Sequence, residues 1–164
     1  MIKKLGAALV MVVGLVVVAI VIRGQAEPNR LPPEVVRVLE AADSFVLLSL
    51  DPAAETKASP EVFHEEAVLG RADIRDPEQR RQLLQALYDG IGKAEGQIAK
   101  CWNPRHGIRA THGEEVVDLV ICFECLHLEY YAGHSGVVLT TGAPEKLFSR
   151  ALEAAGVPRP GAPK

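Results

Sequence analysis

Apolar residues recur along this chain with the two periods that distinguish strands from helices. Short apolar runs bounded by turn residues predict strands over residues 44–50, 67–75 and 137–141. The first run, SFVLLSL, is stopped by Asp51-Pro52, and the second contains Gly70 and is weaker. These runs predict that strands form a large part of the domain.

Apolar residues at spacings of three and four predict three helices. A short helix is expected over residues 33–42, with Pro33 in its first turn. A longer one follows Asp76, which can cap it, and buries one apolar face made of Leu83, Leu84, Leu87 and Ile91. A last helix opens at Pro144 and ends before Gly156.

Residues 101–131 predict one long β-hairpin whose alternating side chains define two faces. With a two-residue turn at His112-Gly113, Thr111 is expected to face Glu114. The alternation changes phase after Cys125, which predicts a β-bulge there. The face expected in the core carries Trp102, Pro104, His106, Ile108, Ala110, Val117, Leu119, Ile121, Phe123 and Cys125.

The order of these elements predicts an α+β domain with a mostly antiparallel sheet, a central β-hairpin and flanking helices. The 138 residues after Ala26 suffice for one hydrophobic core. We expect a signal anchor or signal peptide over 1–26, a linker and short helix over 27–43, the α+β domain over 44–158 and a loose tail over 159–164.

The N-terminus predicts a membrane segment. Lys3 and Lys4 precede an uncharged apolar run of 18 residues, 5–22, which as a helix at about 1.5 Å per residue just crosses a bilayer core. Gly24-Gln25-Ala26 also offers a cleavage site for a signal peptide. We therefore expect a bacterial envelope protein, anchored in the inner membrane with its domain outside the cytoplasm, or secreted after cleavage at Ala26.

Charge argues against a nucleic-acid partner. Three of the 18 basic residues (Lys3, Lys4 and Arg23) precede the domain, which leaves 15 basic residues against 21 acidic ones. No basic stripe is present that could release counterions from a phosphate backbone. A protein partner is left undefined by the sequence.

The cysteines supply the candidate chemistry. Cys101, His106, Cys122 and Cys125 have the composition of a Cys3His structural zinc site. A disulfide of Cys101 with Cys122 or Cys125 is the alternative in an exported domain. Three buried thiols without either role are a further alternative, and redox catalysis is disfavoured because the Cys-x-x-Cys does not begin a helix.

The other face of the hairpin carries the polar residues Arg105, Arg109, Asp118 and Glu124. Such residues most often form a ladder of ion pairs, although they could also bind an anion or perform acid–base chemistry. A nucleophilic Cys101 assisted by His106 lacks an evident third group to orient it.

Two motifs, Cys-Trp-Asn-Pro-Arg-His-Gly-Ile (101–108) and Asp-Leu-Val-Ile-Cys-Phe-Glu-Cys (118–125), carry a resemblance to a known group. Together they resemble a group of uncharacterised bacterial proteins, usually exported or membrane-anchored, with a Cys-x-x-Pro-Arg-His-Gly-Ile segment followed by Cys-Phe-Glu-Cys. The similarity covers about 44–158, with Trp102 where a Phe is typical. It implies a type of domain and no reaction.

These observations predict a non-enzymatic, membrane-tethered or exported domain with a structural Cys/His site on its central hairpin. One alternative is an envelope enzyme that uses Cys101 or the face of Arg105, Arg109, Asp118 and Glu124. Another is a plain protein-interaction module.

Overall fold

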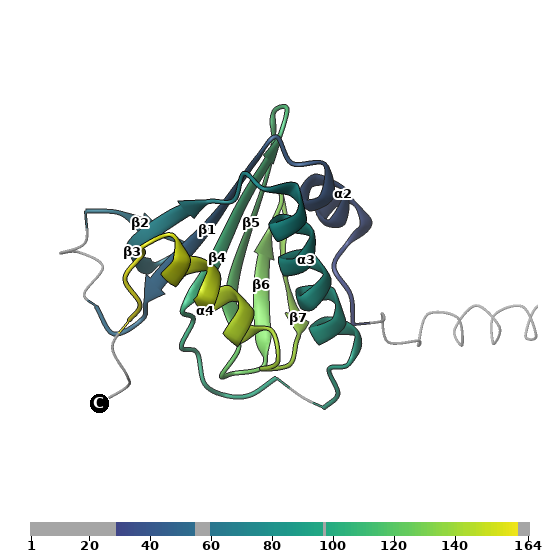
Figure 1. Cartoon of the computed structure of the whole chain (residues 1–164). Helices are drawn as coiled ribbons and strands as arrows, with labels where there is room; N and C mark the ends of the chain where they lie inside the picture. Colours follow the sequence, from purple (N-terminus) through teal and green to yellow (C-terminus); the bar gives the residue numbers. More distant parts are fainter. Residues whose placement is uncertain (1–28, 55–59, 97, 161–164) are drawn as a thin grey trace, which may run out of the picture.

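A curled, seven-stranded sheet with helices on one face forms the core of this chain (Figure 1). The structure is a computed structural model and describes residues 29–54, 60–96 and 98–160. The strand order is β2-β3-β1-β4-β5-β6-β7, and the paired strands are antiparallel. The prediction of an α+β fold with a mostly antiparallel sheet is confirmed.

The described residues form three helices and seven strands, joined by turns and loops. In chain order they are α2 (Pro33–Ala41), β1 (Ser44–Asp51), β2 (Val62–Phe63), β3 (Glu66–Asp73), α3 (Pro77–Gly92), β4 (His106–His112), β5 (Glu115–Cys122), β6 (His127–Tyr131), β7 (Ser135–Leu139) and α4 (Glu145–Ala154).

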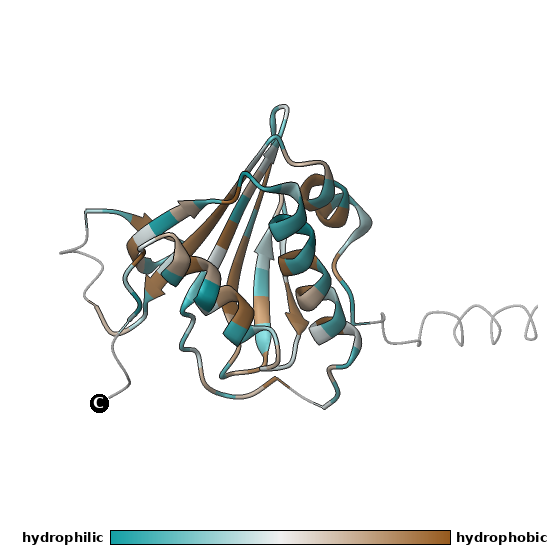
Figure 2. Cartoon of the chain, viewed as in Figure 1, coloured by the Kyte–Doolittle hydropathy of each residue, from teal (hydrophilic) through white to brown (hydrophobic). Residues whose placement is uncertain are grey.

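The helices bury one apolar face of the sheet. The backbone N–H of Glu78 donates to Asp76 Oδ1 at 3.0 Å and caps α3, as the sequence predicted. Fully buried side chains then join helix to sheet, each stabilising the fold by about 1.5–3 kcal/mol. They include Val35, Leu39, Leu83, Leu87, Ile108, Leu119, Ile121, Phe148 and Leu152. In Figure 2 the outer side of α3 is mostly hydrophilic, whereas β1 and β5 behind the helices are largely hydrophobic.

The segment predicted as one hairpin contains three strands. β5 ends at Cys122, the chain turns through residues 123–126 with Leu126 at φ 59°, and β6 begins at His127. The prediction of a β-bulge near Cys125 is therefore wrong, because the chain makes a turn between two strands there. The apolar positions change phase because Cys122 pairs with His127, so that even positions of β5 and odd positions of β6 share a face.

The turn between β4 and β5 differs from the predicted one by a single position. Gly113, at φ 59°, occupies the first of the two turn residues, and His112 pairs with Glu115. Arg109 consequently faces Asp118 instead of Val116. A shift of two residues in register leaves the side chains of β4 and β5 on their expected faces, because the side-chain period of a strand is two.

The sheet curls on the side away from the helices and buries a second, smaller cluster of Leu48, Leu50, Phe63, Val68 and Val120. Phe63 reaches this cluster from the β2–β3 hairpin. It lies directly over Gly107, where a Cβ atom would be only 2.9 Å from the Phe63 ring. The absence of a side chain at Gly107 thus allows the hairpin to fold onto the sheet.

Within the ranges that the structure describes, no helix has both the length and the apolar character needed to cross a bilayer. The apolar run predicted as a membrane segment, 5–22, lies outside those ranges.

Replacement of Gly107 by Ala is expected to lower the free energy of unfolding by about 1–3 kcal/mol, because the new methyl group must displace Phe63 or Leu48. Urea unfolding measures the loss. Gly92→Ala is the matched control, since nothing lies within 4 Å of its Cβ position at the end of α3. Equal stability of the two variants would contradict close packing of the hairpin against Gly107.

Candidate functional site

A disulfide joins Cys101 to Cys125, with their Cα atoms 5.6 Å apart. The bond fixes the irregular segment before β4 to the turn between β5 and β6. Of the two partners that the sequence allowed for Cys101, the structure selects Cys125. Cys101 therefore has no free thiolate with which to act as a nucleophile.

Cys122 is a free, fully buried cysteine next to this bond. Its sulfur accepts a hydrogen bond from the backbone N–H of Cys125 at 3.1 Å. Burial raises the pKa of the Cys122 thiol. The thiol thus stays protonated at neutral pH, which suits a packing role better than a reactive one.

His106 does not join the cysteines. It lies on the helix-covered face, where its Nε2 is 3.2 Å from Ser149 Oγ and its ring contacts Phe123 and Phe148. The structure brings the three cysteines together but not the four predicted zinc ligands, Cys101, His106, Cys122 and Cys125. In the described part of the chain, no group of three or more His, Cys, Asp or Glu residues is arranged to hold a metal ion.

The four residues of the predicted polar face form two separate ion pairs and do not share one face, because Arg105 lines a cavity on the helix-covered side. Arg109 donates twice to Asp118, with Nε–Oδ1 at 2.8 Å and Nη2–Oδ2 at 2.7 Å. Arg105 lies 4.0 Å from Glu124, which also accepts a hydrogen bond from Asn103. The Asp118 side chain is 8% exposed and that of Arg109 is 50% exposed, so the carboxylate is shielded from solvent while the guanidinium group is half-exposed.

His64 extends the Arg109–Asp118 pair and was not identified from the sequence. Its Nε2 lies 2.7 Å from Asp118 Oδ2, and its ring stacks on Tyr131 with centroids 3.8 Å apart. His64 and Glu65 form the β2–β3 turn in left-handed conformations, at φ 46° and 72°. Such backbone strain costs on the order of 1–3 kcal/mol per residue and has to be offset by surrounding contacts. The ion pairs and the stacked ring offset it here.

Trp102 lies on the face away from the helices, not in the core as predicted. Its indole is 38% exposed, stacks on His127 and donates from Nε1 to Glu66 Oε1 at 3.1 Å. Burial raises the pKa of the Glu66 carboxyl, and the Trp102 hydrogen bond opposes this change. The contact holds the segment after Cys101 against β3.

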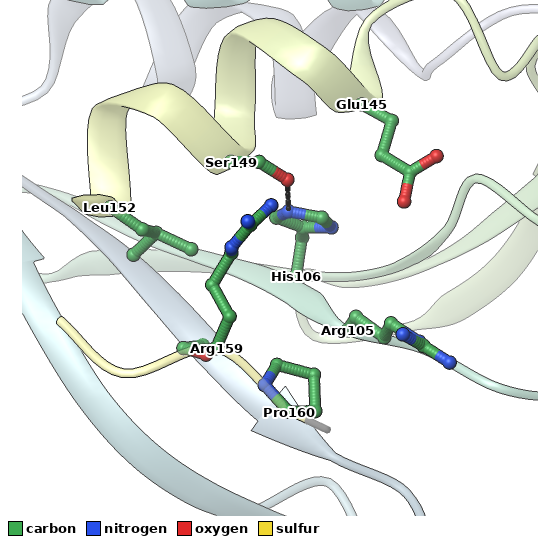
Figure 3. A pocket seen from close by; sticks show the side chains of 8 residues that line it. Arg105, His106, Glu145, Ser149, Leu152, Arg159 and Pro160 are labelled. Atoms are coloured by element: carbon green, nitrogen blue, oxygen red, sulfur yellow. Dashed lines mark hydrogen bonds between the residues drawn. The ribbon is translucent and has the colours of Figure 1, made fainter. Parts of the chain in front are cut away.

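A cavity of about 280 Å³ lies on the opposite, helix-covered side (Figure 3). Strands β1 and β4 form its base, and α4 and the C-terminal segment form its walls. The residues that line it are Ser49, Arg105, His106, Glu145, Ser149, Leu152, Arg159 and Pro160. Figure 3 shows the Arg159 side chain extending alongside the His106 ring.

Local features of the sheet place these residues. Ser49 and His106 are partners across β1 and β4, and the register of β1 against β3 shifts immediately after Ser49. The C-terminal segment approaches β3 closely at Gly70, where a Cβ atom would be 3.0 Å from Val157 Cγ1. A small residue in β3 therefore permits the approach that carries Arg159 to the cavity.

The cavity keeps His106 neutral. Burial, reinforced by the positive charges of Arg105 and Arg159, lowers the pKa of His106 to about 4. At neutral pH the imidazole therefore has one N–H donor and one acceptor nitrogen. Together with Ser49 and Ser149 it provides uncharged polar groups beside two guanidinium groups.

No family model, curated protein or solved structure matches this chain. The resemblance to the exported bacterial group accordingly stays a prediction, and the function has to be argued from geometry.

Acid is expected to destabilise the protein partly through His106. Its folded-state pKa of about 4 lies below the unfolded value, so the contribution is complete above about pH 6.5 and shrinks as the pH falls towards about 4. Unfolding free energies measured in urea at several pH values test this, with His106→Gln as the comparison. If the variant loses stability with falling pH as steeply as the parent, burial of neutral His106 does not contribute.

Proposed function

We propose that this chain is a membrane-tethered or exported domain of the bacterial envelope whose Cys101–Cys125 disulfide has a structural role. The bond itself carries the proposal, because disulfides persist in oxidising compartments such as the periplasm and are rare in the cytosol. The apolar run 5–22 supplies the tether, with cleavage after Ala26 as the route to a secreted form.

The surroundings of the bond support a structural role over a redox one. Catalytic disulfides depend on a thiol with a lowered pKa, commonly at a helix N-terminus. Here Cys125 follows the end of a strand, and the remaining thiol, Cys122, has a raised pKa. The bond spans 24 residues of sequence, and closing a loop of that length stabilises a fold by about 3–4 kcal/mol in the chain-entropy description.

Expression of the full chain in a bacterium tests the location. We expect it in the membrane fraction, or outside the cell if Ala26 is the cleavage site, with the domain accessible to protease in spheroplasts before lysis. Alkylation without reductant is expected to label a single cysteine per denatured chain, Cys122. Protection of the domain until lysis, together with three labelled cysteines, would overturn the proposal.

Loss of the disulfide is expected to lower the free energy of unfolding by about 2–4 kcal/mol. The test compares unfolding of the parent and of Cys101→Ser/Cys125→Ser, each with and without reductant. The parent should lose stability on reduction, whereas the double variant should already be less stable and respond to reductant no further. Cys122→Ala is the control, because it retains the bond and should keep the full response.

An envelope enzyme that uses the polar face is the second candidate, favoured by one observation. His64 is held by a buried carboxylate, Asp118, as a general base often is. A screen of the full chain for hydrolase activity, repeated with His64→Gln, separates the two functions. Activity of the parent that disappears in a folded variant would favour the enzyme. An inactive parent whose His64→Gln variant is less stable would indicate that the His64–Asp118 contact only holds the β2–β3 turn against the sheet.

A further inference from the structure

The cavity beneath α4 contains more hydrogen-bonding capacity than its own residues use. Ser49 Oγ and Arg105 Nε are buried, and no described residue offers either of them a hydrogen-bond partner. Ser49 is fully buried, and the imidazole opposite it belongs to a residue only 4% exposed. Leaving a buried donor without a partner costs about 1–3 kcal/mol unless something else satisfies it.

The charges around the cavity indicate what would satisfy these donors. Arg105 and Arg159 both line the cavity, and the positive charges of both act on His106. Arg105 is 22% exposed and its ion pair with Glu124 is long, at 4.0 Å, which leaves donors available. Glu153, which does not line the cavity, forms an ion pair with Arg159, with Nη2 and Oε1 2.5 Å apart.

Glu145 limits the charge that the cavity can accept. It lies on the wall that α4 forms and is the acidic residue among those lining the cavity. Glu145 opposes the two guanidinium groups inside the cavity, and Glu153 and Glu124 also pair with Arg159 and Arg105 from outside it. These carboxylates disfavour a multiply charged anion in the cavity.

We propose that this cavity binds the oxyanion group of a small soluble ligand, a carboxylate or a phosphate with a preference for the singly charged form. Guanidinium groups recognise both kinds of oxyanion through paired N–H donors. Ser49 at the base adds a hydroxyl donor, and Ser149 with neutral His106 completes the polar wall. This inference goes beyond the proposed function and does not depend on it.

Nuclear magnetic resonance of the full chain in detergent micelles tests the site. The His106 ring resonances are followed while acetate or inorganic phosphate is added, with sodium chloride at matched ionic strength as the reference. We expect a saturable shift with at least one of the two oxyanions and none with chloride. The two titrations also identify which oxyanion the cavity prefers.

Variants with a matched control identify the binding groups. Arg159→Gln is expected to weaken binding about tenfold, equivalent to ~1.4 kcal/mol. Arg75→Gln removes the same charge from an 89% exposed side chain that does not line the cavity, and it should bind like the parent. Equal weakening in both variants would show a general effect of charge and overturn the site.

Ser49→Ala separates an effect on binding from an effect on the stability of the fold. Because the hydroxyl has no partner among the described residues, its removal should leave the unfolding transition nearly unchanged and still weaken binding. Arg105→Gln should weaken binding as well, and its unfolding transition is measured in parallel. Absence of a saturable shift in the parent with either oxyanion, or unaltered binding in Ser49→Ala and Arg159→Gln, would refute the proposal.

Discussion

The pairing of β4 with β5 is the interaction on which the rest of the structure depends. Their side chains are buried on both sides of the sheet: Ile108 and Leu119 beneath the helices, Val120 beneath the β2–β3 hairpin. A strand pair covered on both faces has little freedom to slip, because a shift of one residue would exchange the two environments. The same constraint places Arg109 opposite Asp118, where the pair can reach His64 in the hairpin turn.

The disulfide fixes a segment without regular secondary structure to this strand pair. Residues 101–105 form no strand, yet they contact both sides of the sheet: Trp102 reaches Glu66 on one side, and Arg105 reaches the cavity on the other. By fixing the start of this segment to the β5–β6 turn, the bond limits where both side chains can lie. Its structural role therefore extends to the position of a cationic group in the cavity.

Side-chain periodicity predicted the faces of β4 and β5 correctly, since a period of two does not depend on the exact turn. The register was wrong by two because the turn began at Gly113 instead of ending there. The sequence of the turn at 123–126 was mistaken for a bulge, because a bulge and a tight turn shift the alternation of apolar and polar residues in the same way. His64 was missed because it follows a strand of two residues, too short to produce a pattern. The cavity was missed because it draws on segments far apart in sequence, from β1 to the C-terminal residues.

Two polar residues interrupt the apolar rows beneath α4. Phe45 and Leu47 in β1, and Ile108 and Ala110 in β4, face the helices, and the next position towards the cavity in each row is Ser49 or His106. Burying a hydroxyl and an imidazole at cross-strand positions costs free energy that two apolar side chains would not. His106 is partly compensated by Ser149 and two aromatic rings, but the Ser49 hydroxyl has no partner among the described residues, so the stability of the fold gives no reason for it. Recognition of a ligand at this location supplies that reason, whereas the disulfide and the Arg109–Asp118 pair are explained by stability.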